Sequence, residues 1–236
     1  MENFVFYRGP SELDGSPIIG VAIVKSRNIK TGDMVQTWIL PDGGMLPTDA
    51  MRDGADAGCC GDCPLRGEFD GDGNRIKGSR ICYVHPQGIN TTYAHNAHRD
   101  VVTPEEFADK IRTIGKPIRL GAFGEPPAIP FDVWEPMLYM LQDTGLGWTG
   151  YTHQWRRPEF ECWQDYLMAS IQDVDEILEN HPTPNRWRWF RANTDGPVKG
   201  SEILCPNTAN KDVKCTDCLL CVGNSKTAKS IYNPIH

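Results

Sequence analysis

The sequence predicts an α/β protein, built as a partial (β/α) barrel or a mostly parallel sheet, with an N-terminal β-hairpin and two cysteine-rich metal-binding loops. Three observations predict this class. Apolar, β-branched runs joined by a turn-rich segment open the chain, strand and helix patterns alternate between residues 103 and 192, and most of the nine cysteines lie in two groups. Strands that alternate with helices are typical of a parallel sheet, because each helix returns the chain to the start of the next strand.

The hairpin is predicted from residues 19–24 and 34–40, which favour strands, and from the turn-forming residues 26–33 between them. Residues 41–78 are then dense in Gly, Asp and Pro and carry the first cysteine group. A loop of this length in a compact domain is usually functional or organised by a metal. We therefore expect residues 41–85 to form a metal-binding loop.

Helix signals follow this loop. Thr103 is an N-cap, Glu106 completes a capping box, and Gly115 ends the helix. The pattern then predicts strands at 118–123, 148–154, 166–171 and 186–192, with helices at 131–144 and from residue 173. In such folds the chemistry lies at the carboxyl ends of the strands. We divide the chain into an α/β domain, residues 1–203, and a cluster-binding cysteine-rich tail, residues 204–236.

The tail carries four cysteines in the pattern C-x9-C-x2-C-x2-C. They are Cys205, Cys215, Cys218 and Cys221. A C-x2-C pair points two sulfurs at one centre, and soft thiolates select zinc or iron–sulfur clusters. Three thiolates within seven residues suit the corners of a cubane better than a zinc tetrahedron, which is usually built from two separated pairs. We therefore favour a 4Fe–4S cluster here, with zinc as the alternative.

A disulfide framework is not favoured. The first residues lack the order of a signal peptide, and no apolar run approaches the roughly 20 residues of a membrane span, which predicts a cytoplasmic protein without a membrane partner. Clustered cysteines in a reducing compartment are more often ligands than disulfides, and nine is an odd number.

A nucleic acid is a second kind of partner to consider. The net charge of −7 and the pI of about 5.4 disfavour binding by phosphate neutralisation. Residues 186–191, however, interleave three arginines with three aromatic residues, which can stack on bases. The alternative is a strand with one exposed charged face, because the alternation has period two.

The predicted strand at 118–123 runs directly into Gly124, Glu125 and Pro126. A strand followed by Gly-Glu-Pro and a helix resembles the second strand of the radical S-adenosylmethionine superfamily, where a GGEP-type motif binds the amino group of the cofactor. The resemblance spans residues 34–192. It implies a partial barrel, S-adenosylmethionine as a cofactor, and contacts to it from Gly124 and Glu125.

The cluster motif of that family is C-x3-C-x2-C, and this chain departs from it. Asp56 stands at the first position, with Cys60 and Cys63 at the other two, and Cys82 is available further along the loop. Three cysteines leave one iron of a cluster open, which is what lets the family's cofactor bind. Cys60, Cys63 and Cys82 therefore suffice chemically, although their spacing is foreign to the family.

A second resemblance covers most of the chain. Residues 30–34, 60–64, 82–84 and 150–155 are similar to segments of uncharacterised cysteine-rich proteins encoded by bacteriophages. This resemblance implies a viral accessory protein in the host cytoplasm and assigns it no activity.

Two histidines are candidates for the first site. His153 follows a predicted strand, as Glu125 does, and is a candidate catalytic acid, base or ligand, or else a structural histidine. His85 lies three residues after Cys82 and completes the alternative zinc site, with Cys60, Cys63, Cys82 and His85 as its ligands.

Two hypotheses follow. In the first, the protein is an iron–sulfur enzyme or electron-transfer protein with one or two 4Fe–4S clusters and with Glu125 and His153 in its active site. In the second, zinc or a cluster stabilises a binding protein that contacts a nucleic acid or a host protein without catalysis. No motif identifies a substrate, and no P-loop, dinucleotide fingerprint or Ser-His-Asp order is present.

Overall fold

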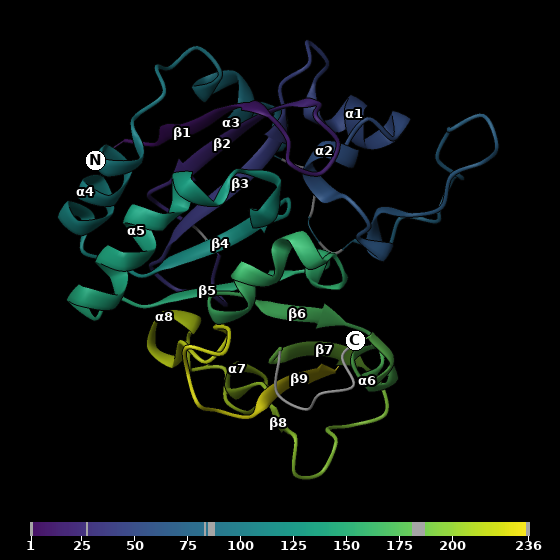
Figure 1. Ribbon diagram of the computed structural model, residues 1–236, viewed down its shortest axis with the longest axis vertical. Coiled ribbons are helices and arrows are strands. Elements are labelled where there is room, and N and C mark those ends of the chain that lie inside the picture. The colour runs from purple at the N-terminus through teal and green to yellow at the C-terminus, as the bar shows by residue number, and fades with distance from the viewer. Residues whose placement is uncertain (1, 27, 83, 85–87, 181–186, 235–236) are drawn as a thin grey trace.

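The computed structural model describes residues 2–26, 28–82, 84, 88–180 and 187–234, which form an open, nine-stranded sheet (Figure 1). The strand order is β1-β2-β3-β4-β5-β6-β7-β9-β8. The pairs β1–β2 and β2–β3 are antiparallel, and all the later pairs are parallel. The predicted class, a mostly parallel sheet with an N-terminal hairpin, is confirmed.

The strands are β1 (Phe4–Pro10), β2 (Pro17–Ile23), β3 (Val35–Pro41), β4 (Ile118–Phe123), β5 (Trp148–Thr152), β6 (Met168–Ile171), β7 (Trp189–Asn193), β8 (Glu202–Leu204) and β9 (Ser230–Pro234). The α-helices are α1 (Pro47–Asp53), α2 (Ala57–Cys60), α3 (Ile89–Asn96), α4 (Pro104–Ile114), α5 (Phe131–Thr144), α6 (Val174–Asn180), α7 (Pro206–Ala209) and α8 (Cys215–Cys218). The 3-10 helices are η1 (Pro64–Arg66), η2 (Pro126–Ala128), η3 (Gln154–Arg156) and η4 (Pro158–Asp165).

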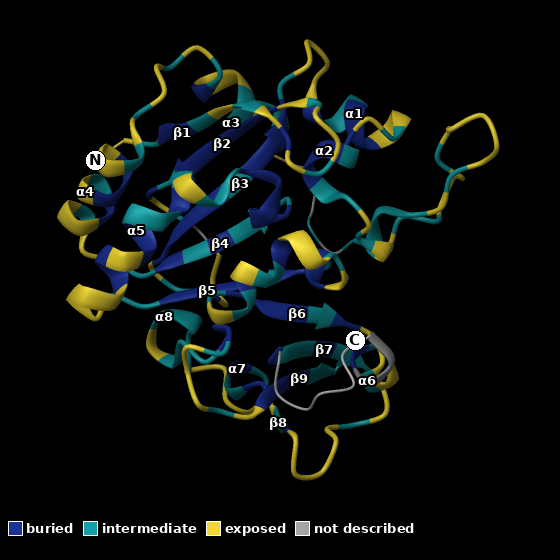
Figure 2. Cartoon of the chain, in the orientation of Figure 1, coloured by how far each residue is buried: buried dark blue, intermediate teal, exposed yellow. Residues whose placement is uncertain are grey.

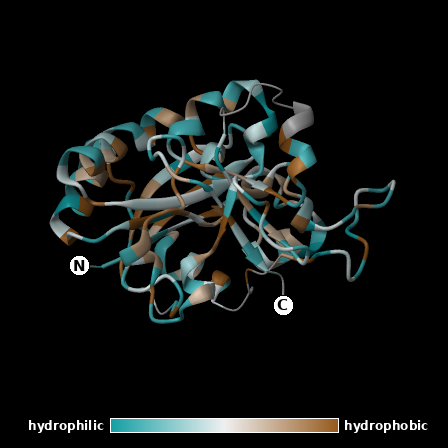
Figure 3. Cartoon of the chain, turned by 90° about the horizontal axis from the view of Figure 1, so that it is seen from below, coloured by the Kyte–Doolittle hydropathy of each residue, from teal (hydrophilic) through white to brown (hydrophobic). Residues whose placement is uncertain are grey.

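Helices α4 and α5 cover one face of the sheet. The capping box at Thr103 starts α4, and its apolar stripe buries Phe107 and Ile111 completely. Phe107 stacks on Phe6 of β1 with 4.5 Å between the ring centroids, and Trp134 of α5 meets the same ring edge-on. Figure 3 shows these helices as a layer along one side of the strands. Burial of these aromatic rings holds the sheet and the helical layer together.

The opposite face has two separate coverings. Over the N-terminal strands, Ile19 and Leu40 pack against Met51 of α1 and Ile89 of α3. Over β5–β9 the covering is the C-terminal cysteine segment, whose buried cysteines pack against Met168 and its neighbours on that face. Side chains alternate between the faces of a strand, so Met168 points away from the α4–α5 layer. β2, β3 and β5 are accordingly buried along most of their length (Figure 2).

The structure differs from the prediction at several boundaries. β6 and β7 begin two to three residues later than predicted, and the predicted loop at 41–85 contains α1, α2 and η1. β1 and α3 were not predicted. β9 pairs with β7 and β8, so the tail from residue 204 contributes a strand to the sheet of residues 1–203. None of the described helices is long and apolar enough to cross a membrane.

The prediction that the arginines of residues 186–191 form an exposed face is wrong. Arg188 and Arg191 are 8% and 1% exposed, because each finds a full set of internal acceptors. Arg188 donates to backbone carbonyls of the tail, and Arg191 donates to the buried carboxylate of Glu202 at 2.8 and 2.7 Å. Arg186 lies outside the described residues. Neither buried arginine is available to a nucleic acid.

Candidate metal centre

Three strand ends meet at the carboxyl edge of the sheet. β3 leads into the loop with Cys60 and Cys63, β4 runs into Gly124 and Glu125, and β5 runs into His153. The parallel pairing of β3 with β4 and of β4 with β5 places these ends side by side. This is the edge at which parallel sheets carry their sites.

Two glycines let β4 approach the cysteine loop closely. Gly121 (φ 65°) lies in the irregular part of the β3–β4 pairing, and Gly124 has φ 78°. A Cβ atom on Gly124 would lie 2.7 Å from the carbonyl oxygen of Ile39 and 3.2 Å from that of Cys59. The N–H of Glu125 donates to the Cys59 carbonyl at 2.7 Å. A backbone hydrogen bond therefore joins the Gly-Glu-Pro segment to the first cysteine group.

The Glu125 carboxylate is buried and is held by β5. Its Oε2 accepts hydrogen bonds from Thr152 Oγ1 at 2.7 Å and from the His153 N–H at 3.0 Å. Its Oε1 accepts from His153 Nδ1 at 2.7 Å. These bonds orient the imidazole so that Nε2 lies 3.8 Å from Cys63 Sγ.

Further thiols surround this group. Among the described residues, only Cys63, Glu125 and His153 have ligand atoms that all lie within 4.8 Å of one another. The Cys60 thiol interacts electrostatically with Cys63 and Glu125, and the Cys82 thiol interacts with Cys63 and His153. Cys60 and Cys82 therefore lie near the Glu125–His153 pair but outside the group of three mutually close ligand atoms.

An ion pair orders the cysteine loop. Asp56 is 3% exposed, and its Oδ1 accepts from Arg66 Nε at 3.0 Å and from Nη2 at 2.9 Å. Arg66 also donates to the carbonyls of Gly54 and Gly61. The position at which the resembled family has its first cysteine is thus occupied by an acid that holds the loop in place.

Burial and neighbouring charges shift the acidity of the site. Burial raises the pKa of the Cys60 thiol well above its usual value, and Asp56 adds to the effect. Burial opposes the charged form of His153, but the Glu125 carboxylate and Cys63 outweigh it and raise the pKa of His153 well above its usual value. Burial therefore favours the protonated thiol of Cys60, and the neighbouring carboxylate of Glu125 favours the charged imidazole of His153.

The arrangement suits a soft metal centre. Thiolates and imidazole are the ligands of zinc and iron, and a carboxylate that accepts from the second ring nitrogen of a histidine fixes its tautomer and orientation. A thiol, an imidazole and a carboxylate in this order can also form a nucleophile and its base. The additional thiols of Cys60 and Cys82 favour ligation, because a single nucleophile has no use for them.

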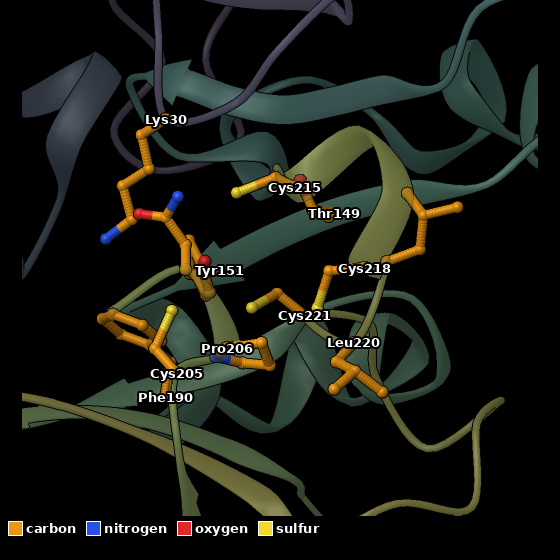
Figure 4. Close-up of a pocket in the computed structure, with 12 residues that line it drawn as sticks. Lys30, Thr149, Tyr151, Phe190, Cys205, Pro206, Cys215, Cys218, Leu220 and Cys221 are labelled. Carbon is orange, nitrogen blue, oxygen red and sulfur yellow. The ribbon is translucent and has the colours of Figure 1, made fainter. Parts of the chain in front are cut away.

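The four tail cysteines form a second, separate group. They line one small cavity with Tyr151 and Phe190, as Figure 4 shows. The structure therefore gathers all seven predicted cysteine ligands into two places. His85, the fourth ligand of the alternative zinc site, lies outside the described residues. Cys59 is buried in the core beneath α4 and α5, and its neighbour Cys60 packs against the same core.

Sequence reasoning missed several residues of the first site. Thr152 holds Glu125, Arg66 holds Asp56, and Gln154 is fully buried and donates from Nε2 to the Cys60 carbonyl at 3.3 Å. Thr152 and Gln154 are the direct neighbours of His153 in the sequence. The run of polar residues at the end of the strand could therefore have indicated that they belong to the site. Nothing local marks Arg66, because its partner and acceptors are defined by the folded loop.

No protein-family model, curated protein or solved structure matches the chain, and the candidate centre is therefore defined by its own geometry.

Proposed function

We propose that this chain is an iron–sulfur protein in which Cys60, Cys63 and Cys82 hold a 4Fe–4S cluster beside the Glu125–His153 pair. The observation that supports the proposal is that thiols, an imidazole and a buried carboxylate from three strand ends converge at the carboxyl edge of the sheet. The fold buries a large core without a metal, so the site is not needed simply to hold the chain together.

The thiol spacing supports a cluster over one ion. Ligands of a single tetrahedral zinc lie about 3.8 Å apart, since the Zn–S bond is about 2.3 Å. Cys60 and Cys82 fall outside the group of mutually close ligand atoms around Cys63. Thiolates at the corners of a cubane are further apart, because each binds a different iron. Three such thiolates leave the fourth iron without a protein ligand.

Glu125 and His153 lie where they can contact a ligand bound to the fourth iron. Three of the roughly four acceptor sites of the Glu125 carboxylate are used by Thr152 and His153, which leaves one for the donor group of a ligand. An amino group is such a donor, and S-adenosylmethionine is the ligand that the resemblance implies. The protein is then a divergent, phage-encoded relative of radical S-adenosylmethionine enzymes, with His153 positioned to accept or donate a proton at the bound ligand.

The test is anaerobic purification followed by iron, sulfide and zinc analysis and electron paramagnetic resonance of the reduced protein. The triple variant Cys60→Ser, Cys63→Ser, Cys82→Ser should lose one cluster. The matched control Cys162→Ser, at an exposed cysteine, should lose none. His153→Ala should keep its iron, and its spectrum should no longer respond to added S-adenosylmethionine as the wild-type spectrum does.

Zinc is the second candidate, and one distance favours it. Cys63 Sγ and His153 Nε2 are 3.8 Å apart, close to the separation of two ligands on one zinc ion. In that case the wild-type protein contains zinc without sulfide, and His153→Ala loses the metal. Stoichiometric zinc that disappears in His153→Ala would overturn the iron–sulfur proposal for this site.

A further inference from the structure

The proposed function does not explain the four tail cysteines, although backbone hydrogen bonds fix the position of each part of the chain that carries them. Cys205 directly follows β8, and its N–H donates to the Tyr232 carbonyl at 2.7 Å. Cys215 and Cys218 stand at the two ends of α8, whose N-terminal residue donates to the Lys30 carbonyl of the β2–β3 turn. Cys221 accepts at its carbonyl from the Gly150 N–H of β5 at 2.9 Å. Four thiols are thus delivered from three backbone anchors to one cavity (Figure 4).

The backbone turns sharply between Cys218 and Cys221. Leu219 has φ 47°, and it is the one described residue other than glycine with a positive φ. A left-handed conformation costs a branched residue on the order of 1 kcal/mol and persists only where the surroundings enforce it. Leu219 is held by close packing on Gly147, where a Cβ atom would have no room. This turn directs Cys221 back toward Cys215 and Cys218.

Arg188 fixes the conformation of the same segment. Arg188 is buried and donates to the carbonyls of Val222 at 2.6 Å, Lys229 at 2.7 Å, Ala228 at 2.8 Å and Leu220 at 3.1 Å. A guanidinium with a full set of acceptors fixes the loop around Cys221 in one conformation.

Cations lie beside the tail cysteines in a chain whose net charge is −7. Lys30 lines the cavity together with the four cysteines. Lys226 donates to the carbonyl of Leu219 at 3.2 Å, and Arg188 donates to the carbonyls of Leu220 and Val222 on either side of Cys221. Three cations beside this segment favour an occupant that carries negative charge, as a thiolate-bound metal centre does.

The spacing of the tail sulfur atoms argues against a single zinc ion. No three of the tail thiols have sulfur atoms within 4.8 Å of one another, since among the described residues only the Cys63 group meets that condition. Four sulfurs on one zinc ion would be about 3.8 Å apart. Four sulfurs that each bind a different corner of a cubane are more widely spaced.

From these observations we infer that Cys205, Cys215, Cys218 and Cys221 bind a second 4Fe–4S cluster, fully ligated by the protein, on the sheet face opposite α4 and α5. Tyr151 is its neighbour from β5, and it lines the cavity with Cys221, so that its hydroxyl is the group placed to donate a hydrogen bond to that sulfur. Hydrogen bonds to the ligand sulfurs tune the potential of a cluster. Tyr151 is therefore a positioning and tuning residue of this centre.

The test uses the whole chain, purified without oxygen. The double variant Cys215→Ser, Cys218→Ser should lose about four iron and four sulfide per chain, while the triple variant at Cys60, Cys63 and Cys82 should keep them. Unchanged iron and sulfide in the double variant, or zinc that is lost from it, would overturn the inference. Because the two variants address different thiols, failure of the first centre and failure of the second are distinguishable.

A milder variant keeps the inference testable if the double variant does not fold. Tyr151→Phe removes one hydroxyl and should leave the iron and sulfide content unchanged. The reduction potential of one cluster should become more negative, because a sulfur that loses a hydrogen bond carries more charge and disfavours reduction. The potential of the first cluster should not move. Identical potentials for both clusters in Tyr151→Phe and wild type would contradict the assignment.

Discussion

The Glu125 carboxylate is bound to His153 at two points, through Nδ1 of the ring at 2.7 Å and through the backbone N–H at 3.0 Å. The first bond sets the ring orientation, and the second sets the path of the chain as it leaves β5. The imidazole cannot turn away from Cys63 without breaking the first bond, and the strand end cannot shift without breaking the second. The two residues therefore behave as one unit.

Glu125→Gln should weaken this unit. A glutamine side chain has one acceptor oxygen, so its NH2 group must face a donor of His153 or Thr152. A buried donor left unpaired costs about 1–3 kcal/mol of the free energy of unfolding, which denaturant unfolding measures. Outer-sphere partners of this kind also contribute about 10–100-fold to affinity or activity at a metal site. Glu105→Gln, at an exposed residue of α4, is the matched control and should be near neutral in both assays.

Arg66→Met should disorder the first cysteine loop. It leaves the Asp56 carboxylate buried without its partner, which costs about 3–5 kcal/mol when a buried pair is broken on one side. We expect loss of iron from the first centre and not from the second.

Arg52→Met is the control for that variant, because Arg52 pairs with Asp49 and Asp53 on the exposed surface of α1. The double variant Asp56→Asn, Arg66→Met should recover part of the lost stability, since the unpaired charge is gone. If the double variant is no more stable than Arg66→Met, the ion pair is not what holds the loop.

Arg188→Met should release the tail. Its guanidinium satisfies several buried carbonyls of residues 220–229, and a methionine side chain, which has no N–H donor, satisfies none. Hydrogen bonds to charged groups contribute about 1.5–3 kcal/mol each, so the loss should exceed about 3 kcal/mol. Limited proteolysis should then cut within 219–229 before it cuts elsewhere. Arg157→Met, at a more exposed arginine paired with Glu159, serves as the control. Cleavage patterns that match wild type would contradict the anchoring role.

Glu202 should make stability depend on pH in the acid range. Its buried carboxylate accepts from Arg191, Trp189 and the Val198 N–H. Burial alone would raise the pKa of Glu202, but these hydrogen bonds outweigh burial and lower the pKa below its usual 4.5. The folded protein therefore favours the ionised form. The resulting stability is complete above pH 4.5 and is lost as the pH falls from there through the folded pKa.

Glu202→Gln should accordingly lower the free energy of unfolding by about 3 kcal/mol at pH 7. The difference from wild type should shrink at each step below pH 4.5, as urea unfolding across that range measures. Glu105→Gln, at an exposed carboxylate of α4, should follow the wild-type profile. The difference in free energy of unfolding between wild type and Glu202→Gln could instead stay constant down to pH 3. In that case the charge of Glu202 would not be the source of the stability that its pairing with Arg191 provides.

The sequence by itself determined the fold class and several of its strands and helices. Thr103, Glu106 and Gly115 mark the ends of α4 because caps act within one turn, and strand patterns and cysteine spacing are equally local. For Glu125 and His153, the sequence predicted that both follow strands and lie at the same edge of the sheet, but it did not predict the hydrogen bonds between them. Tertiary structure decided the rest. The partners of Asp56, Glu202 and Arg188 lie 10, 11 and up to 41 residues away. No local pattern distinguishes an arginine that binds buried carbonyls from one that faces water, since only the folded chain determines which acceptors surround it.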